Sequence, residues 1–186
     1  MNRNDLITSF TSRAEAMGAR VIPVAGPEAV APRLTEVLRP LGAKIALVDS
    51  PLVKNAGIEK ALAGAGFSVE KDGAAFARQA DTGIVEFEYG IAETGTLAMD
   101  ATDLKTRLAA MLPLTCVALL PAARLRANLA EVIEAYLARG PWPGYFTLVT
   151  GPSRTADIER SLTIGVHGPE QLLIILVGDG GSGSGQ

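Results

Sequence analysis

Residues 115–120 read Thr-Cys-Val-Ala-Leu-Leu, an apolar run of strand length with no charged side chain. After it, residues 125–138 carry apolar side chains at helical spacing, and we expect this helix to end at Arg139-Gly140-Pro141. Short apolar strands that alternate with helices are typical of a layered α/β architecture. This stretch therefore predicts an α/β fold in which helices flank a largely parallel sheet.

The same alternation continues in both directions along the chain. We expect further strands at residues 20–24, 44–48, 67–69, 82–87, 96–99, 145–149 and 171–177. We expect helices at residues 4–18, 27–41, 52–63 and 73–80, and a helical turn at 156–160. Because residues 82–87 and 96–99 are joined through glycines, we expect this pair to add a β-hairpin to the parallel sheet.

Length and composition indicate one globular domain. The chain has 186 residues, of which 48% are hydrophobic, and its mean hydropathy is +0.25. We expect residues 1–177 to form a single α/β domain that is long enough to bury a core. Residues 178–186 read Gly-Asp-Gly-Gly-Ser-Gly-Ser-Gly-Gln, and we expect this Gly/Ser-rich tail to be disordered.

The charge distribution argues against a nucleic-acid partner. The net charge is -3 and the isoelectric point is about 5.2, and the sequence shows no basic stripe. The N-terminus lacks the apolar segment of a secretory signal, and the apolar run at 172–177 is too short to span a bilayer. We therefore expect a cytoplasmic protein with no membrane span.

The chain has one cysteine and one histidine. Cys116 lies within an apolar run, which is typical of a buried small hydrophobe rather than a nucleophile. A single cysteine excludes an intramolecular disulfide and a cysteine-rich metal or iron–sulfur site within this chain, and a single histidine is a weak metal signal. We expect no metal site and no cofactor bound by this chain, and we leave a homo-oligomer open.

The densest group of ligand-type residues is the stretch 89–97, Tyr-Gly-Ile-Ala-Glu-Thr-Gly-Thr-Leu. Its glycines allow a sharp turn and a close approach to a ligand, and its threonine hydroxyls and free amides can hold an oxyanion. Glu93 can orient, bind or attack a substrate, and we predict it as a catalytic residue. The predicted ligand-binding residues here are Gly90, Thr94, Gly95 and Thr96. The alternative is a structural turn with an exposed glutamate and two threonines of high β propensity.

A second group lies at residues 150–159, Thr-Gly-Pro-Ser-Arg-Thr-Ala-Asp-Ile-Glu. A strand is expected to end at Thr150, and a glycine turn then leads into a helical turn whose free amides favour an anion. Arg154 adds a planar donor fork for phosphate or carboxylate. The alternative is that Arg154 forms an internal ion pair with Asp157 or Glu159. The predicted ligand-binding residues here are Gly151, Ser153, Arg154, Thr155 and Asp157.

The third group, residues 165–170, reads Gly-Val-His-Gly-Pro-Glu. Any imidazole chemistry must use His167, which we predict as a catalytic base with Glu93, Asp157 or Glu170 as its partner. The alternative is a turn residue that hydrogen-bonds to the backbone. Gly168 is a predicted ligand-binding residue. So is Arg107, which we expect to lie near the 82–99 hairpin, and the alternative is a solvated arginine on the surface.

The three groups, in this order, resemble the LUD domain family, and within it the LutC/YkgG-like lactate utilization proteins. The resemblance covers the chain from about Gly18 to Val177. It implies a fold like that of the NagB/RpiA/CoA-transferase superfamily. It also implies a role in the oxidation of L-lactate to pyruvate beside iron–sulfur partner proteins, which would hold the clusters and carry the electrons.

The function expected from this resemblance is a component of a lactate-oxidising complex that binds a small anionic metabolite. Whether the isolated chain is itself an enzyme stays open. One alternative is a stand-alone acyl- or phosphoryl-handling enzyme that uses Glu93, Arg154 and His167 on a CoA ester or a sugar phosphate. Another is a non-catalytic module that senses a small carboxylate.

Overall fold

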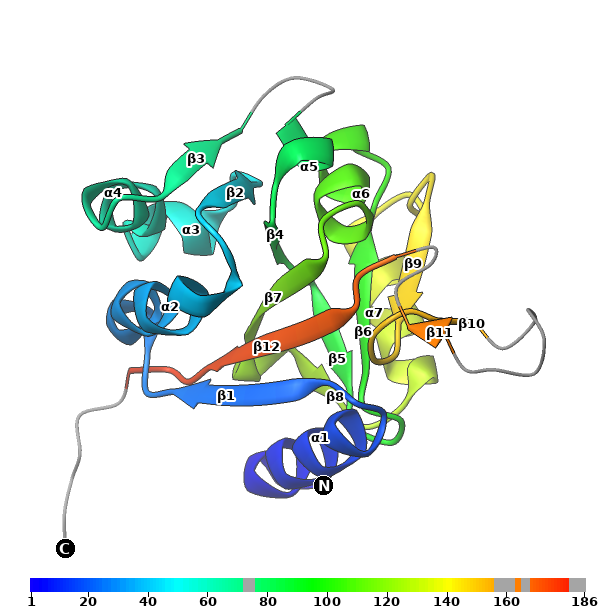
Figure 1. Ribbon diagram of the computed structural model, residues 1–186. Helices are drawn as coiled ribbons and strands as arrows, with labels where there is room; N and C mark the ends of the chain where they lie inside the picture. Colours follow the sequence, from blue (N-terminus) through cyan, green and yellow to red (C-terminus); the bar gives the residue numbers. More distant parts are fainter. Residues whose placement is uncertain (72–75, 156–162, 165–167, 181–186) are drawn as a thin grey trace, which may run out of the picture.

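The computed structural model describes residues 1–71, 76–155, 163–164 and 168–180 (Figure 1). At its centre lies a parallel six-stranded sheet with the strand order β1-β12-β7-β4-β2-β3. Its strands are β1 (Arg20–Val24), β2 (Lys44–Leu47), β3 (Ser68–Glu70), β4 (Thr82–Glu86), β7 (Thr115–Pro121) and β12 (Gln171–Val177). The predicted α/β fold with a largely parallel sheet is confirmed.

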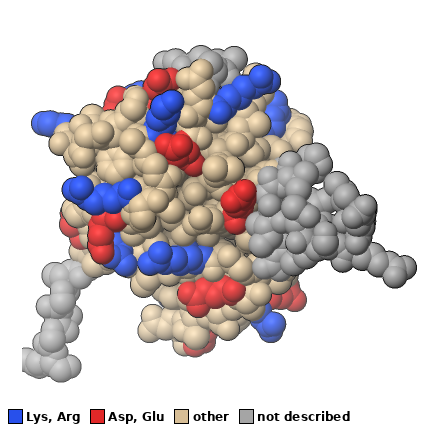
Figure 2. Space-filling view, viewed as in Figure 1, with Lys and Arg blue, Asp and Glu red and all other residues tan. Residues whose placement is uncertain are grey.

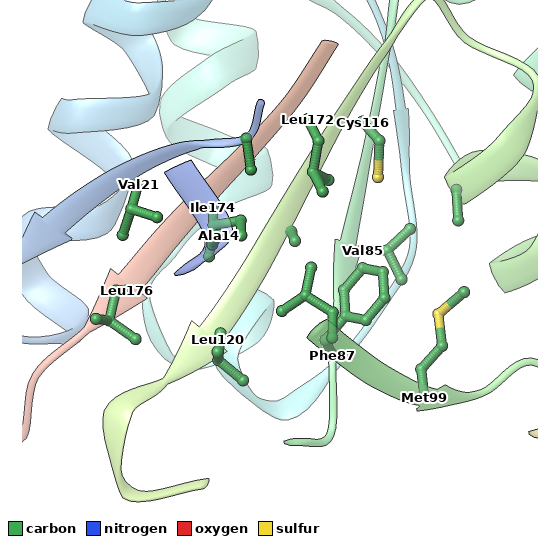
Figure 3. Packing of buried hydrophobic residues seen from close by; sticks show 14 of the residues in the cluster. Ala14, Val21, Val85, Phe87, Met99, Cys116, Leu120, Leu172, Ile174 and Leu176 are labelled. Atoms are coloured by element: carbon green, nitrogen blue, oxygen red, sulfur yellow. The ribbon is translucent and has the colours of Figure 1, made fainter. Parts of the chain in front are cut away.

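The central strands are buried on both faces, since successive side chains of a strand point to opposite sides. In β7, Cys116, Ala118 and Leu120 enter one core cluster, whereas Val117 and Leu119 enter another. Figure 3 shows Leu172, Ile174 and Leu176 of β12 in the first cluster, together with Cys116 and Leu120. Burial on both faces explains why residues 116–120 of β7 and 172–177 of β12 are continuously apolar.

Helices cover both faces of the sheet (Figure 1). One face packs against α2 (Val30–Leu38), α3 (Pro51–Asn55) and α4 (Ile58–Gly64). The other face packs against α1 (Arg3–Ala16), α5 (Phe76–Gln79), α6 (Leu104–Met111) and a second sheet.

The second sheet has the strand order β8-β5-β6-β9. Its strands are β8 (Leu125–Arg126), β5 (Tyr89–Ile91), β6 (Thr96–Asp100) and β9 (Phe146–Val149). Its outer side packs against α7 (Leu129–Arg139) through Val132 and Tyr136, which form a small core with Tyr89 and Ile91. A short antiparallel ribbon of β10 (Arg154–Thr155) and β11 (Thr163–Ile164) follows β9.

The added hairpin is present, but its strands differ from those we expected. β6 pairs with β5, and β4 stays in the central sheet. The expected helix at 125–138 begins only at Leu129, because residues 125–126 form β8 beside β5. The expected strand at 145–149 pairs with β6 in the second sheet.

The other differences lie in the helices. The expected helix at 52–63 is divided into α3 and α4, because Gly57 has a φ of 60° and a left-handed residue cannot continue a right-handed helix. The expected helix at 27–41 has 3-10 turns at both ends, η1 (Pro27–Ala29) and η2 (Arg39–Leu41). Residues 72–75 and the expected helical turn at 156–160 lie outside the described residues.

The first residues of the expected tail contact β1. The N–H groups of Gly178 and Gly180 donate to the carbonyl oxygens of Val24 and Ala25, each at 2.9 Å. Asp179 pairs with Arg3 of α1. Residues 181–186 lie outside the described part, so the disorder of the tail stays a prediction. None of the described helices has both the length and the hydropathy to cross a membrane.

The tip of the β5–β6 hairpin rests directly on the last turns of α1. Gly95 has a φ of 68°, and a Cβ atom at this position would lie 2.2 Å from the backbone nitrogen of Ala14. Gly151 has a φ of 71°, and its Cβ would lie 2.3 Å from the carbonyl oxygen of Met17. Any side chain at these two positions would push the turns off the helix.

We predict that Gly95→Ala lowers the free energy of unfolding by about 3 kcal/mol or more, since it combines backbone strain with a clash. The matched control is Gly57→Ala, which has the same left-handed backbone but no atom within 4 Å of the new Cβ. Strain alone should cost this variant about 1 kcal/mol. Urea denaturation measures both, and equal losses would contradict the packing role of Gly95.

Candidate functional site

The connections that leave the neighbouring strands β2 and β4 cross opposite faces of the central sheet. β2 leads into α3 on one face, whereas β4 leads through β5 and β6 to α6 on the other. In open α/β sheets, ligands bind beyond the carboxyl ends of the strands where the connections diverge in this way. The ends of β2 and β4 are therefore the expected place for a ligand.

A cleft of about 450 Å³ opens at this place. We call it the arginine cleft, and it is lined by Ser50, Pro51, Glu86, Glu88, Tyr89, Arg124, Arg126 and Arg139. Three guanidinium groups face two carboxylates, so the lining has an excess of one positive charge. By contrast, basic and acidic side chains intermingle on the face shown in Figure 2. The cleft thus combines the position and the charge that suit a bound anion.

Glu86, the last residue of β4, is the buried carboxylate of the arginine cleft. Its side chain is 6% exposed and accepts a hydrogen bond of 3.0 Å from the N–H group of Leu52. One of its oxygens lies 2.7 Å from Nη1 of Arg124, which also donates to the carbonyl oxygen of Phe87 at 3.3 Å. These contacts fix the guanidinium of Arg124 in the wall of the cleft.

Glu88, which also lines the cleft, is held by a second set of polar contacts. It accepts hydrogen bonds from the hydroxyl of Tyr136 and, at 3.2 Å, from the N–H group of Asp100, and it lies 3.3 Å from Arg139. Burial raises the pKa of Tyr136 well above its usual range, and the hydrogen bond to Glu88 raises it further. The phenol therefore stays protonated at neutral pH and acts as a donor.

Arg126 differs from the other two arginines of the cleft. Its Nη1 donates to the carbonyl oxygens of Leu125 at 2.9 Å and of Ala123 at 3.2 Å, which orients the side chain. Its guanidinium carbon lies 5.1 Å from the ring centroid of Tyr89. Within the described part of the chain, no carboxylate pairs with Arg126. A held guanidinium without a carboxylate partner is suited to a carboxylate or phosphate of a ligand.

The predicted residues of the first sequence group lie away from this cleft. In the described structure, the lining of the arginine cleft does not include Glu93, which is exposed at the tip of the hairpin. The Thr94 hydroxyl donates to that of Thr96 at 2.7 Å, and the Thr96 hydroxyl lies 2.8 Å from that of Thr150. Gly90 packs tightly, since a Cβ there would lie 2.7 Å from the side chain of Leu125.

The structure nevertheless brings the three sequence groups side by side. The threonine contacts join the first group to the second, and the N–H group of Ser153 donates to the carbonyl oxygen of Pro169 at 2.9 Å. Gly151, Ser153 and Gly168 line a pocket of about 240 Å³ together with Cys116 and mainly apolar residues. We call it the motif pocket. It lies at the amino ends of β7 and β12, opposite to the arginine cleft.

Of the remaining predicted site residues, some are described fully, some only by their backbone, and some lie outside the described residues. Arg107 of α6 packs over the ring of Tyr145 at 4.5 Å and donates to the carbonyl oxygen of Ala101 at 3.2 Å. The backbones of Arg154 and Thr155 form β10. Asp157 and His167 lie outside the described residues. The roles of Glu93 and His167 in catalysis stay predictions.

Sequence reasoning missed the arginine cleft because its residues belong to no single motif. A signal existed, because charged residues lie at or shortly after the ends of the expected strands: Glu86 and Glu88 at the end of 82–87, and Arg124 four residues after 115–120. These residues can be recognised as one site only when the order of the strands in the sheet is known. In the regions that the structure describes, no three His, Cys, Asp or Glu residues gather into a metal-type cluster.

Comparisons with known proteins agree on one family. The profile of the LUD domain matches residues 7–177. Lactate utilization protein C of Bacillus subtilis is 36% identical over 107 residues, which are 55% of this chain and 45% of that protein. Lactate utilization protein C of Shouchella clausii is 35% identical over 103 residues, or 54% and 45% of the two chains. The chain thus spans less than half the length of these curated relatives.

A solved structure shares the fold. It is a DUF162 family protein from Deinococcus radiodurans, with a TM-score of 0.65 and 20% sequence identity. The match covers 96% of this chain and 99% of that one.

We predict that Glu86→Gln lowers the free energy of unfolding by about 2 kcal/mol, because it removes the charge that pairs with Arg124 in a largely buried setting. The matched control is Glu36→Gln, since Glu36 pairs with Arg33 but its side chain is 69% exposed. That variant should lose about 0.5 kcal/mol or less. Similar losses in chemical denaturation would show that the Glu86 pair contributes no more than a surface pair.

We predict that Cys116 does not react with a thiol reagent at pH 8 in the folded protein. The thiol is 2% exposed, and burial raises its pKa to about 12, so it is protonated as well as inaccessible. In urea it should react fully. Rapid labelling of the folded chain, followed by absorbance of the released thiolate, would contradict this placement.

Proposed function

The chain belongs to the LUD domain family, and we propose that it serves as a component of L-lactate oxidation to pyruvate. In this proposal it works beside iron–sulfur proteins and binds a small anionic metabolite in the arginine cleft. The names of its relatives support the lactate role, since two of them are lactate utilization protein C. The aligned region covers about half of this chain and less than half of each relative.

The observation that carries the binding part of the proposal is Arg126. Its guanidinium is held by two backbone carbonyl oxygens and by the ring of Tyr89, yet it has no carboxylate partner in the described structure. Such a group binds the carboxylate that lactate and pyruvate share. Arg124 and Arg139 are already paired with Glu86 and Glu88, so they contribute to the shape of the cleft more than to its free charge.

The proposed division of labour follows from the cysteine count. A four-cysteine iron–sulfur cluster cannot be held by a chain with one cysteine, and Cys116 is buried in the apolar core. Electron transfer is therefore assigned to the partner proteins. Glu93 stays a proposed site residue, because its exposed position on the hairpin tip leaves it accessible to a partner protein.

We predict that Arg126→Ala weakens the binding of pyruvate and L-lactate by about tenfold or more, the loss expected when a charged hydrogen-bond partner is removed. Calorimetric titration of the full chain measures the affinity. Arg33→Ala, on the surface of α2, should leave it unchanged. Unaltered affinity in the Arg126 variant would contradict a site in the arginine cleft.

The role in lactate oxidation has a separate test. Deletion of the gene, in a strain without a redundant lactate-oxidising enzyme, should abolish growth on L-lactate, and expression of the intact chain should restore it. Normal growth of the deletion strain would contradict the role. Turnover by the isolated chain would instead favour a stand-alone enzyme.

A further inference from the structure

A second charged cleft lies next to the first. It has a volume of about 280 Å³ and is lined by Asp49, Val53, Lys54, Gly57, Glu59, Lys60 and Lys71. We call it the lysine cleft. Like the arginine cleft, it sets three cations against two carboxylates, which leaves an excess of one positive charge.

The pairing pattern of the lysine cleft also repeats that of the arginine cleft. Lys71 lies 2.8 Å from Glu59 and 3.1 Å from Asp49, and these contacts raise its pKa. Among the described residues, neither Lys54 nor Lys60 pairs with a carboxylate, and both are exposed. Each cleft therefore holds paired charges in its wall and leaves cationic groups for a ligand.

One short segment forms a wall of both clefts. Ser50 and Pro51 line the arginine cleft, whereas Asp49, Val53 and Lys54 line the lysine cleft. This segment connects β2 to α3, which lies on one face of the central sheet. The connections that follow the two neighbouring strands, β3 and β4, lead to α5 and α6 on the opposite face. The two clefts thus flank the end of a single strand.

The size of the arginine cleft argues against a three-carbon acid as its complete occupant. A volume of 450 Å³ falls in the range of roughly 300–1,000 Å³ that is typical of sites for much larger ligands. Lactate would contact Arg126 and leave most of this space to water. The lysine cleft adds a further 280 Å³ on the other side of Ser50 and Pro51.

We propose that the two clefts are subsites of one ligand, an organic anion with two charged heads that lie on either side of the Ser50–Pro51 segment. One head, a carboxylate or a phosphate, binds Arg126, and the other binds Lys54 and Lys60. The part of the ligand that connects the two heads lies across Ser50 and Pro51. This inference deepens the proposed function, on whose arginine cleft it rests, and it names a larger ligand class than lactate.

The physical reason for a gain in affinity is effective concentration. Once the first head is bound to Arg126, the second head is confined near the lysines, and its binding adds to the affinity without a new association step. The gain disappears when the connecting body is too short to span the two clefts. A series of ligands with increasing length therefore tests the proposal directly.

The experiment uses calorimetric titration of the full chain with four sets of probes. The first is the dicarboxylate series from succinate to suberate, and the second is the monocarboxylate hexanoate. The third is fructose 1,6-bisphosphate compared with fructose 6-phosphate, and the fourth is L-lactate. We expect at least one two-headed probe to bind about tenfold or more tightly than its one-headed counterpart. The carboxylate and phosphate arms identify the head group.

The variant Lys54→Ala/Lys60→Ala should remove this advantage and leave the affinity for one-headed probes unchanged. Its matched control is Arg33→Ala, which should alter neither. Equal affinity for two-headed and one-headed probes would overturn the proposal, and so would an advantage that persists in the double variant. A different result would contradict the proposed function, namely that Arg126→Ala leaves the binding of L-lactate and pyruvate unchanged.

Discussion

The structure depends on the pairing of β7 with β12, two adjacent strands that are buried on both faces. Their alternating side chains supply two separate cores, one beneath α2, α3 and α4 and the other beneath α1, α5, α6 and the second sheet. The full register of this pair fixes where each strand ends. Arg124 and Arg126 follow the carboxyl end of β7, and the neighbouring strand β4 ends at Glu86. The packing of the apolar strands therefore determines where the charged residues of the arginine cleft meet.

The glycine turns of the first two sequence groups have a structural explanation in this fold. Gly95 and Gly151 have left-handed backbones and approach the backbone at the C-terminal end of α1, at Ala14 and at the capping residue Met17, too closely for any side chain. The hydroxyls of Thr94, Thr96 and Thr150 hydrogen-bond to one another, which joins the two turns. These residues build the support on which the second sheet meets α1, whereas the groups suited to an anion are distributed over the ends of separate strands.

The inner strands β7 and β12 of the central sheet were predictable because they are apolar runs of strand length, and burial on both faces produces that pattern locally. The second sheet was predicted only in part. Its strands β6 and β9 were expected, whereas β5 has three residues and β8 has two, too few to show a period. Their pairing is decided by tertiary contacts, with Tyr89 and Ile91 packed against α7. The arginine cleft escaped prediction for a related reason: Ser50, Glu86 and Arg124 meet only through the strand order, which local sequence does not encode.

The central claim is that the anion binds at the carboxyl ends of β2, β4 and β7 rather than in the motif pocket or at the Glu93 turn. The most direct measurement is the change in assigned backbone amide NMR signals when pyruvate is added to the full chain. The account predicts saturable shifts at Tyr89, Arg124 and Arg126, with small changes at residues 93–96 and 151–153. Saturable shifts confined to residues 93–96 or 151–153, with Arg126 unaffected, would contradict it.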